Sequence, residues 1–171
     1  MAFSSLVVFL LFTALVLPAQ ASKADALGED IGSPDLSLYY TAEELYRMAE
    51  AYGEQGRSDY IRARFTFDLV WPLVYTVFLV SALSWVYKKA FALDSPWQRV
   101  NLAPLAGALF DLLENLSTSL VMLRYPAPTP LVDTLAPVFT ALKWVFVSGS
   151  ILLLLIGIAV AIWRKASGLS R

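Results

Sequence analysis

The sequence predicts an all-α membrane protein, a bundle of four transmembrane helices, or of three if the N-terminal segment is a cleaved signal. Hydrophobic residues make up 58% of the 171 residues and charged residues 16%, against about 45–50% and about 25% in soluble domains. The apolar residues gather in four blocks, residues 3–17, 67–87, 102–123 and 135–163. A helix needs about 20 apolar residues to cross a bilayer, and each of the last three blocks has that length.

The first block has two interpretations. It is followed by Pro18 and then Ala19-Gln20-Ala21, a small-x-small pattern typical of a signal-peptide cleavage site. Against a signal, residues 1–5 carry no Lys or Arg. Against a span, residues 3–17 are short for a bilayer crossing. Residues 1–21 are therefore either a signal peptide or the first transmembrane helix, and both alternatives export the residues that follow.

Residues 22–64 form the one sizeable polar region, and we expect them to be extracytoplasmic. Thr41 followed by Glu44 is a capping box, which marks the start of a helix. Apolar residues recur at helical spacing after it, and Gly53 is typical of a helix end, so we expect an amphipathic helix over residues 42–53. This helix is expected to pack on the outer ends of the bundle or to lie in the membrane interface, with four tyrosines at headgroup depth: Tyr39, Tyr40, Tyr46 and Tyr52.

Basic residues indicate which face of the membrane each loop occupies. Lys88, Lys89 and Arg99 lie in the short connection after the second block, and Arg164 and Lys165 follow the last block. Positive charge in short loops marks the cytoplasmic face. The bundle, residues 65–165, therefore ends in a cytoplasmic tail, residues 166–171.

The third block contains a polar stripe. Asp111, Glu114, Asn115 and Thr118 stand at offsets i, i+3, i+4 and i+7, so they share one face of a helix. A carboxylate in hydrocarbon costs several kcal/mol, so this face must meet protein, water or a ligand. The stripe is the strongest candidate for a site inside the membrane.

A rise of 1.5 Å per residue places further polar residues at the same depth. Lys143 lies eight residues beyond Leu135, Tyr75 eight beyond Phe67, and Glu114 nine before Leu123. We therefore expect Glu114, Tyr75 and Lys143 in one layer about 12 Å from the outer face, with Lys143 and Glu114 as a buried pair.

The second block adds Asp68 and a proline. Asp68 lies about one turn inside the outer boundary, where it is expected either to join the site or to pair with Arg62 or Arg64. Pro72 should kink the helix and free a backbone carbonyl near Phe67 or Asp68.

The stripe has a structural and a functional interpretation. Polar groups often hold membrane helices together, and Lys143 accounts for one carboxylate in that way. One lysine neutralises only one carboxylate, so the second carboxylate and the amide on the same face favour a ligand pocket. We therefore expect a binding or accessory protein whose site takes a lipid-like ligand or a membrane-protein partner. The alternatives are a lipid-modifying enzyme using Asp111 or Glu114 as acid/base, and a proton-coupled carrier, which would need an oligomer because so few helices barely enclose a path.

Residues 64–75, Arg-Phe-Thr-Phe-Asp-Leu-Val-Trp-Pro-Leu-Val-Tyr, together with Asp-Leu-Leu-Glu-Asn at 111–115, resemble a group of uncharacterised bacterial integral membrane proteins. The resemblance covers most of the chain from Tyr39 onward, implies no established activity, and implies a location in the bacterial inner membrane. Four spans with buried acids are also similar in architecture to the sterol-isomerase and sigma-2-receptor type of membrane protein. Those isomerases rely on a histidine, and this chain has none.

The composition argues against several kinds of cofactor, metal site and partner. The chain has no cysteine and no histidine, and its net charge is −1 without a long basic run. We therefore expect no disulfide, no zinc or haem site of the usual kind, no cofactor and no nucleic-acid partner. The lipid bilayer is the one partner that the composition predicts directly.

Overall fold

The computed structural model describes residues 2–16, 18, 32–34 and 37–168. Its long regular elements are all helical, in agreement with the predicted fold class. They are the α-helices α1 (Ala2–Leu15), α3 (Ala42–Arg64), α4 (Phe67–Ala90), α5 (Ala103–Arg124) and α6 (Val132–Ala166), with the 3₁₀ helix η2 (Pro96–Leu102) before α5. The cleavage motif at residues 19–21 and residues 169–171 of the predicted tail lie outside the described residues.

Three helical stretches are long and apolar enough to cross a membrane. They are residues 42–90, which join α3 to α4, residues 96–124 and residues 132–166. α1 is apolar but shorter, with 14 residues, or about 21 Å at 1.5 Å per residue. The three predicted main spans therefore correspond to α4, α5 and α6, each a few residues longer or shorter at its ends than the sequence indicates.

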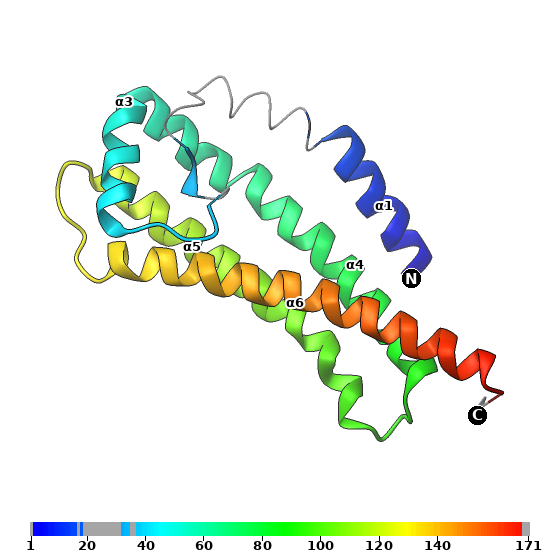
Figure 1. The fold of residues 1–171 in the computed structure, drawn as a ribbon. Helices are drawn as coiled ribbons and strands as arrows, with labels where there is room; N and C mark the ends of the chain where they lie inside the picture. The colour runs from blue at the N-terminus through cyan, green and yellow to red at the C-terminus, as the bar shows by residue number, and fades with distance from the viewer. Residues whose placement is uncertain (1, 17, 19–31, 35–36, 169–171) are drawn as a thin grey trace.

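The helices run up and down, and both ends of the described chain lie at the end of the molecule away from α3 (Figure 1). α5 and α6 have the most extensive contact, and α4 packs against both. α1 lies along α4, where Phe9 stacks on Trp71 and Phe78 and Phe12 stacks on Phe67 and Trp71. Because α1 packs mainly on α4, the three-helix core does not depend on it.

α3 is longer than the predicted helix at residues 42–53. Its start is the expected capping box, in which the Glu44 amide donates to Thr41 Oγ1 and the Thr41 amide donates to Glu44 Oε2. Gly53 does interrupt the helix, with φ 63°, but a helical segment resumes and reaches Arg64. The helix resumes because Tyr60 on the second segment is buried in the same core as Leu45 on the first, so packing continues past the glycine.

α3 packs on α5 and α6 at the ends joined by residues 125–131, and packing on the ends of the bundle is one of the two predicted placements. Tyr46 donates to Asp133 Oδ2 (3.0 Å) and accepts from the Thr129 amide (2.7 Å). Tyr40 is 2% exposed and its hydroxyl lies 3.1 Å from that of Thr140. Tyr40 and Tyr46 therefore contact the bundle directly, whereas Tyr39 is 63% exposed.

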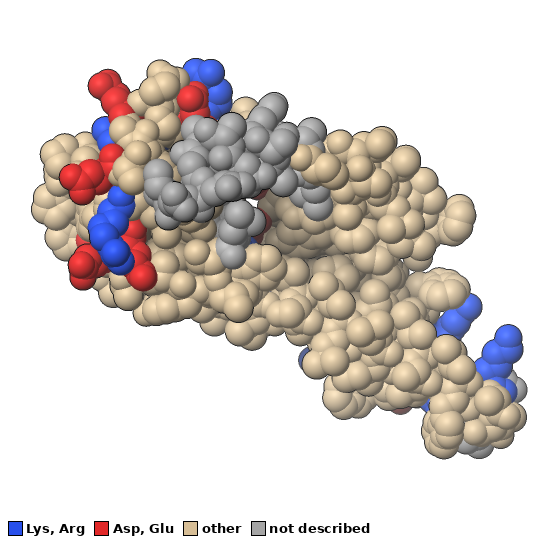
Figure 2. All heavy atoms as spheres, turned by 45° about the horizontal axis from the view of Figure 1, so that its top comes forward, with Lys and Arg blue, Asp and Glu red and all other residues tan. Residues whose placement is uncertain are grey.

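Apolar packing joins the helices at the opposite end. Leu83, Val86 and Tyr87 of α4 form a core cluster with Leu153 and Leu154 of α6. Gly157 allows this approach, since a Cβ there would lie 2.5 Å from Tyr87 Cε2. The space-filling view shows charged side chains over α3 and near the C-terminus, with an uncharged band between them (Figure 2). That distribution is typical of a protein that spans a membrane.

Candidate functional site

Three charged side chains from two helices meet in the bundle interior. Lys143 Nζ of α6 lies 2.5 Å from Glu114 Oε2 and 3.3 Å from Asp111 Oδ1 of α5. The Glu114 side chain is fully enclosed, while those of Lys143 and Asp111 are 9% and 11% exposed. The pairing that the depth arithmetic predicts is therefore present, and Asp111 joins it. We call Asp111, Glu114 and Lys143 the charge cluster.

Tyr75 of α4 lies beside the charge cluster, so a third helix contributes to the site in addition to α5 and α6. It is 7% exposed, and its phenol lies close enough to Asp111 and Glu114 to interact with both carboxylates. A phenol is uncharged at neutral pH, so it can donate a hydrogen bond to an acid without adding charge. The charge cluster thus faces α4 through a hydrogen-bonding group.

Asn115 connects α5 to the turn of α4 that precedes Pro72. Pro72 has no amide hydrogen, so the carbonyl of Asp68, four residues earlier, lacks its helical donor. Asn115 Nδ2 lies 3.5 Å from this carbonyl. The carbonyl predicted to be freed by Pro72 is therefore the one that the predicted stripe residue reaches, which assigns Asn115 a role in packing α5 on α4.

Two of the predicted site residues are separate from the cluster. Thr118 is buried, but its hydroxyl donates to the Glu114 carbonyl of its own helix at 2.9 Å. Asp68 pairs with Arg64 one turn away, with 3.0 Å between Nε and Oδ2. The candidate site therefore consists of the charge cluster and Tyr75, flanked by Asn115.

Two hydroxyls that the sequence analysis did not single out are buried without a hydrogen-bond partner in the described part of the chain. They belong to Thr76 (6% exposed) and Ser119 (5% exposed). Helical hydroxyls elsewhere in this protein, such as those of Thr140 and Ser150, donate to a carbonyl four residues earlier. The oxygen Oδ1 of Asn115 is also buried and unpartnered among the described residues. No spacing rule flags such atoms, because serine and threonine usually satisfy themselves within a helix.

Trp144 links Lys143 to the segment before α3. The Lys143 ammonium lies 5.4 Å from the centre of the Trp144 ring, and Trp144 Nε1 donates to the Ser37 carbonyl at 3.0 Å. The sequence could not predict this contact, since the two residues stand 107 positions apart. The segment before α3 therefore contacts α6 directly beside the charge cluster.

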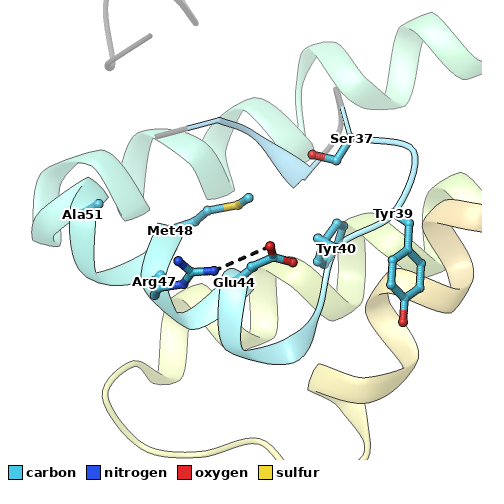
Figure 3. A pocket seen from close by; sticks show the side chains of 7 residues that line it. All are labelled: Ser37, Tyr39, Tyr40, Glu44, Arg47, Met48 and Ala51. Atoms are coloured by element: carbon cyan, nitrogen blue, oxygen red, sulfur yellow. Dashed lines mark ion pairs between the residues drawn. The ribbon is translucent and has the colours of Figure 1, made fainter. Parts of the chain in front are cut away.

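An open hollow of about 380 Å³ lies away from the cluster, between the Ser37–Tyr40 segment and the first turns of α3 (Figure 3). Its charged lining residues, Glu44 and Arg47, pair with each other at 3.5 Å and are largely exposed. Within the described residues no group of three or more acidic side chains is arranged to hold a metal ion. The charge cluster is therefore the site with the most unusual chemistry.

Comparisons of the chain with protein-family models, with curated proteins and with solved structures find no match.

Proposed function

We propose that this chain is an integral membrane binding protein and that the charge cluster with Tyr75 is its binding site. The observation that carries the proposal is the charge count. Lys143 pairs with both Asp111 and Glu114, so these three groups together carry one net negative charge when all are ionised. Such an excess in a low-dielectric interior costs several kcal/mol unless a positive group compensates it.

The ligand that fits this excess is an amphipathic molecule with a cationic head group, such as a long-chain amine. Glu114 is enclosed, whereas Asp111 and Lys143 keep some exposure, so the edge formed by Asp111 is where a head group would enter. The Asn115 oxygen adds a buried acceptor beside it. A polar group of a partner membrane protein or of a second copy would use the same edge.

We place the protein in a membrane with α3 outside and the C-terminus in the cytoplasm, α1 being either a first span or a cleaved signal. The support is the uncharged band in Figure 2 and the basic residues beyond it, which include Lys88, Lys89 and Arg164. Because the chain has no cysteine, introduced cysteines report sidedness directly. Thr134→Cys should react with an impermeant thiol reagent from outside and Ser95→Cys should not, and the opposite result would reverse the topology.

Ligand stabilisation tests the binding proposal. Dodecylamine, dodecanol and dodecyl sulfate share one chain and differ in head-group charge. Dodecylamine should raise the thermal unfolding temperature of the detergent-purified protein more than dodecanol, and Glu114→Gln should remove that difference. Glu43→Gln, which removes an exposed acid on α3, is the matched control and should keep it. Equal responses to the amine and the alcohol in the wild type would refute a cation-selective site.

The enzyme and carrier alternatives use the same groups. An acid/base role for Asp111 or Glu114 is favoured by their contact with one ammonium, which allows the two acids to differ in protonation. Turnover of a membrane lipid that is lost in Glu114→Gln, with no stabilisation by the amine, would support the enzyme instead of the binding protein.

A further inference from the structure

We propose that the end of the bundle away from α3 binds the head group of an anionic phospholipid. The site, which we call the basic collar, consists of five basic side chains on α4, η2 and α6: Lys88, Lys89, Arg99, Arg164 and Lys165. It requires the proposed placement in a membrane, but it shares no residue with the charge cluster and does not depend on the ligand proposed there.

The two ends of the molecule differ in charge. Residues 69–110, which run from α4 through η2 into α5, contain three basic residues and a single acidic one, Asp94, and residues 144–168 of α6 and its end contain two basic residues and no acidic one. Residues 41–64, which contain α3 at the other end, have five acidic and four basic residues. Figure 2 shows lysine and arginine side chains gathered near the C-terminus. The end that carries the basic collar therefore attracts negatively charged groups.

Contacts between the three elements bring the collar together. Arg164 Nη1 donates to the Ala90 carbonyl, which ties the end of α6 to the end of α4. Gln98 Nε2 donates to the carbonyls of Tyr87 and Ala92, both at 3.1 Å, which holds η2 against the same end. Each basic residue of the collar either makes one of these contacts or stands within two positions of a residue that does. The five charges therefore gather at one end of α4, where a single head group can meet several of them.

Exposed tryptophans accompany the collar and favour a lipid over a soluble anion. Trp85 is 55% exposed, Trp97 51% and Trp163 60%. Tryptophan rings are enriched at the level of the lipid head groups, so these three indicate that the collar lies at that level. The Lys89 ammonium lies 3.7 Å from the centre of the Trp85 ring, which holds one charge of the collar directly beside a tryptophan.

The acyl chains of the lipid would lie along α6. The half of this helix that leads to the collar exposes large apolar side chains, among them Leu152, Leu155, Ile156 and Ile162. An anionic phospholipid combines a negative phosphate for the collar with apolar chains for this surface. A zwitterionic phospholipid offers the same chains, but its own cation reduces the attraction to the collar.

Native mass spectrometry of the detergent-purified protein measures this preference. Dioleoyl phosphatidylglycerol and dioleoyl phosphatidylcholine have the same acyl chains and differ in net head-group charge. The wild type should bind phosphatidylglycerol at least 25-fold more tightly. Replacing both lysines, Lys88→Gln with Lys89→Gln, should weaken the binding of phosphatidylglycerol by about 25-fold, since each lysine near an anionic head group contributes about fivefold.

Two matched variants show whether position or total charge matters. Arg62→Gln with Arg124→Gln removes two exposed charges at the end next to α3, and Lys88→Arg with Lys89→Arg keeps both charges of the collar. Both variants should bind phosphatidylglycerol as the wild type does. If the doubly neutralised collar does not fold, Lys88→Gln alone, with an expected loss of about fivefold, takes its place.

Three results would overturn the lipid site. They are equal binding of the two lipids by the wild type, an equal loss in the Arg62→Gln, Arg124→Gln variant, and displacement of phosphatidylglycerol by millimolar inorganic phosphate, which would indicate a site for free anions. The variant with Lys88→Gln and Lys89→Gln should still be stabilised by dodecylamine, because the charge cluster is unchanged. Selective binding of phosphatidylglycerol without stabilisation by the amine would refute the proposed ligand of the charge cluster and support the basic collar.

Discussion

Two halves of the bundle are held together by different kinds of interaction: the half next to α3, which we propose faces outward, and the opposite half, which we propose faces inward. In the outward half, helices meet through charges and hydrogen bonds, such as Lys143 with Glu114 and Tyr46 with Asp133. In the inward half, they meet through close apolar contacts, such as Gly157 with Tyr87. A polar contact between helices can exchange partners with water or a ligand, whereas a close-packed contact cannot. The difference agrees with the proposal that the ligand binds in the outward half, while the inward half is close-packed.

The largest expected effect is the loss of Lys143. Lys143→Met leaves two carboxylates buried without their cation, and breaking such a pair costs about 3–5 kcal/mol. Combining Lys143→Met with Glu114→Gln should recover much of this loss, because the remaining acid can bind a proton. Reversible unfolding in mixed micelles measures both free energies. A double variant as damaged as the sum of the single variants would mean that the charge cluster does not act as a unit.

A smaller loss is expected at the glycine contact of the inward half. In Gly157→Ala the new Cβ meets Tyr87 and Val86, whose nearest atoms lie 2.5 Å and 2.9 Å away. The Tyr87 hydroxyl donates to the Leu153 carbonyl at 2.9 Å, so the ring is anchored and the helices must separate. Overpacking of this kind costs about 1–3 kcal/mol.

Gly149→Ala is the matched control for that change. It lies on the same helix, and a Cβ there meets nothing within 4 Å. The same unfolding measurement should show no loss of stability, since alanine favours a helix interior over glycine. Equal losses at the two glycines would contradict the close packing assigned to the inward half.

The sequence predicts best those features that the fixed geometry of a helix determines, such as the depth of a residue and the partner of a backbone hydrogen bond. Eight or nine residues of helix place Lys143, Tyr75 and Glu114 at one depth, because each residue advances by the same rise, and the structure joins Lys143 to Glu114. Pro72 identifies a freed carbonyl for the same reason, since the missing donor lies at a fixed offset.

The sequence does not predict which of several possible hydrogen-bond partners a side chain takes, or which distant segments meet. Thr118 shares a face with Asp111, but its hydroxyl bonds its own backbone and takes no part in the cluster. Ser37 and Trp144 meet across 107 positions, and no periodicity encodes the path of an irregular segment. Gly53 interrupts α3 as expected, yet tertiary packing of Tyr60 restores the helix beyond it.

The Arg64–Asp68 pair should contribute less to the free energy of unfolding than the charge cluster does, although its two residues are close in sequence. The two residues lie one turn apart on the segment that joins α3 to α4, and their side chains are 11% and 19% exposed. Residues four positions apart are already close in the unfolded chain, so forming this pair orders less of the chain than joining α5 to α6. Asp68→Asn should therefore cost much less than Lys143→Met in the same unfolding assay. A comparable cost would mean that the Arg64–Asp68 pair stabilises the outward half as much as the charge cluster does.

The smallest effect concerns Glu44, at the exposed start of α3. The Thr41 backbone amide, and after it the Thr41 hydroxyl, donate hydrogen bonds to the Glu44 carboxylate and hold its pKa below 4.5, outweighing the small effect of burial. A folded pKa below the unfolded value means that the capping box stabilises α3 above the unfolded pKa and loses this contribution as pH falls through the folded pKa. The amide proton of Thr41 should therefore titrate in NMR spectra with a midpoint below 4.5, and Glu44→Gln should abolish the titration. A midpoint at or above 4.5 would show that the capping box is open in solution. Since the Glu44 side chain lies at the surface, 42% exposed, acidification should fray this turn and leave the charge cluster unchanged. The experiment thus distinguishes surface polar contacts of the outward half from enclosed ones.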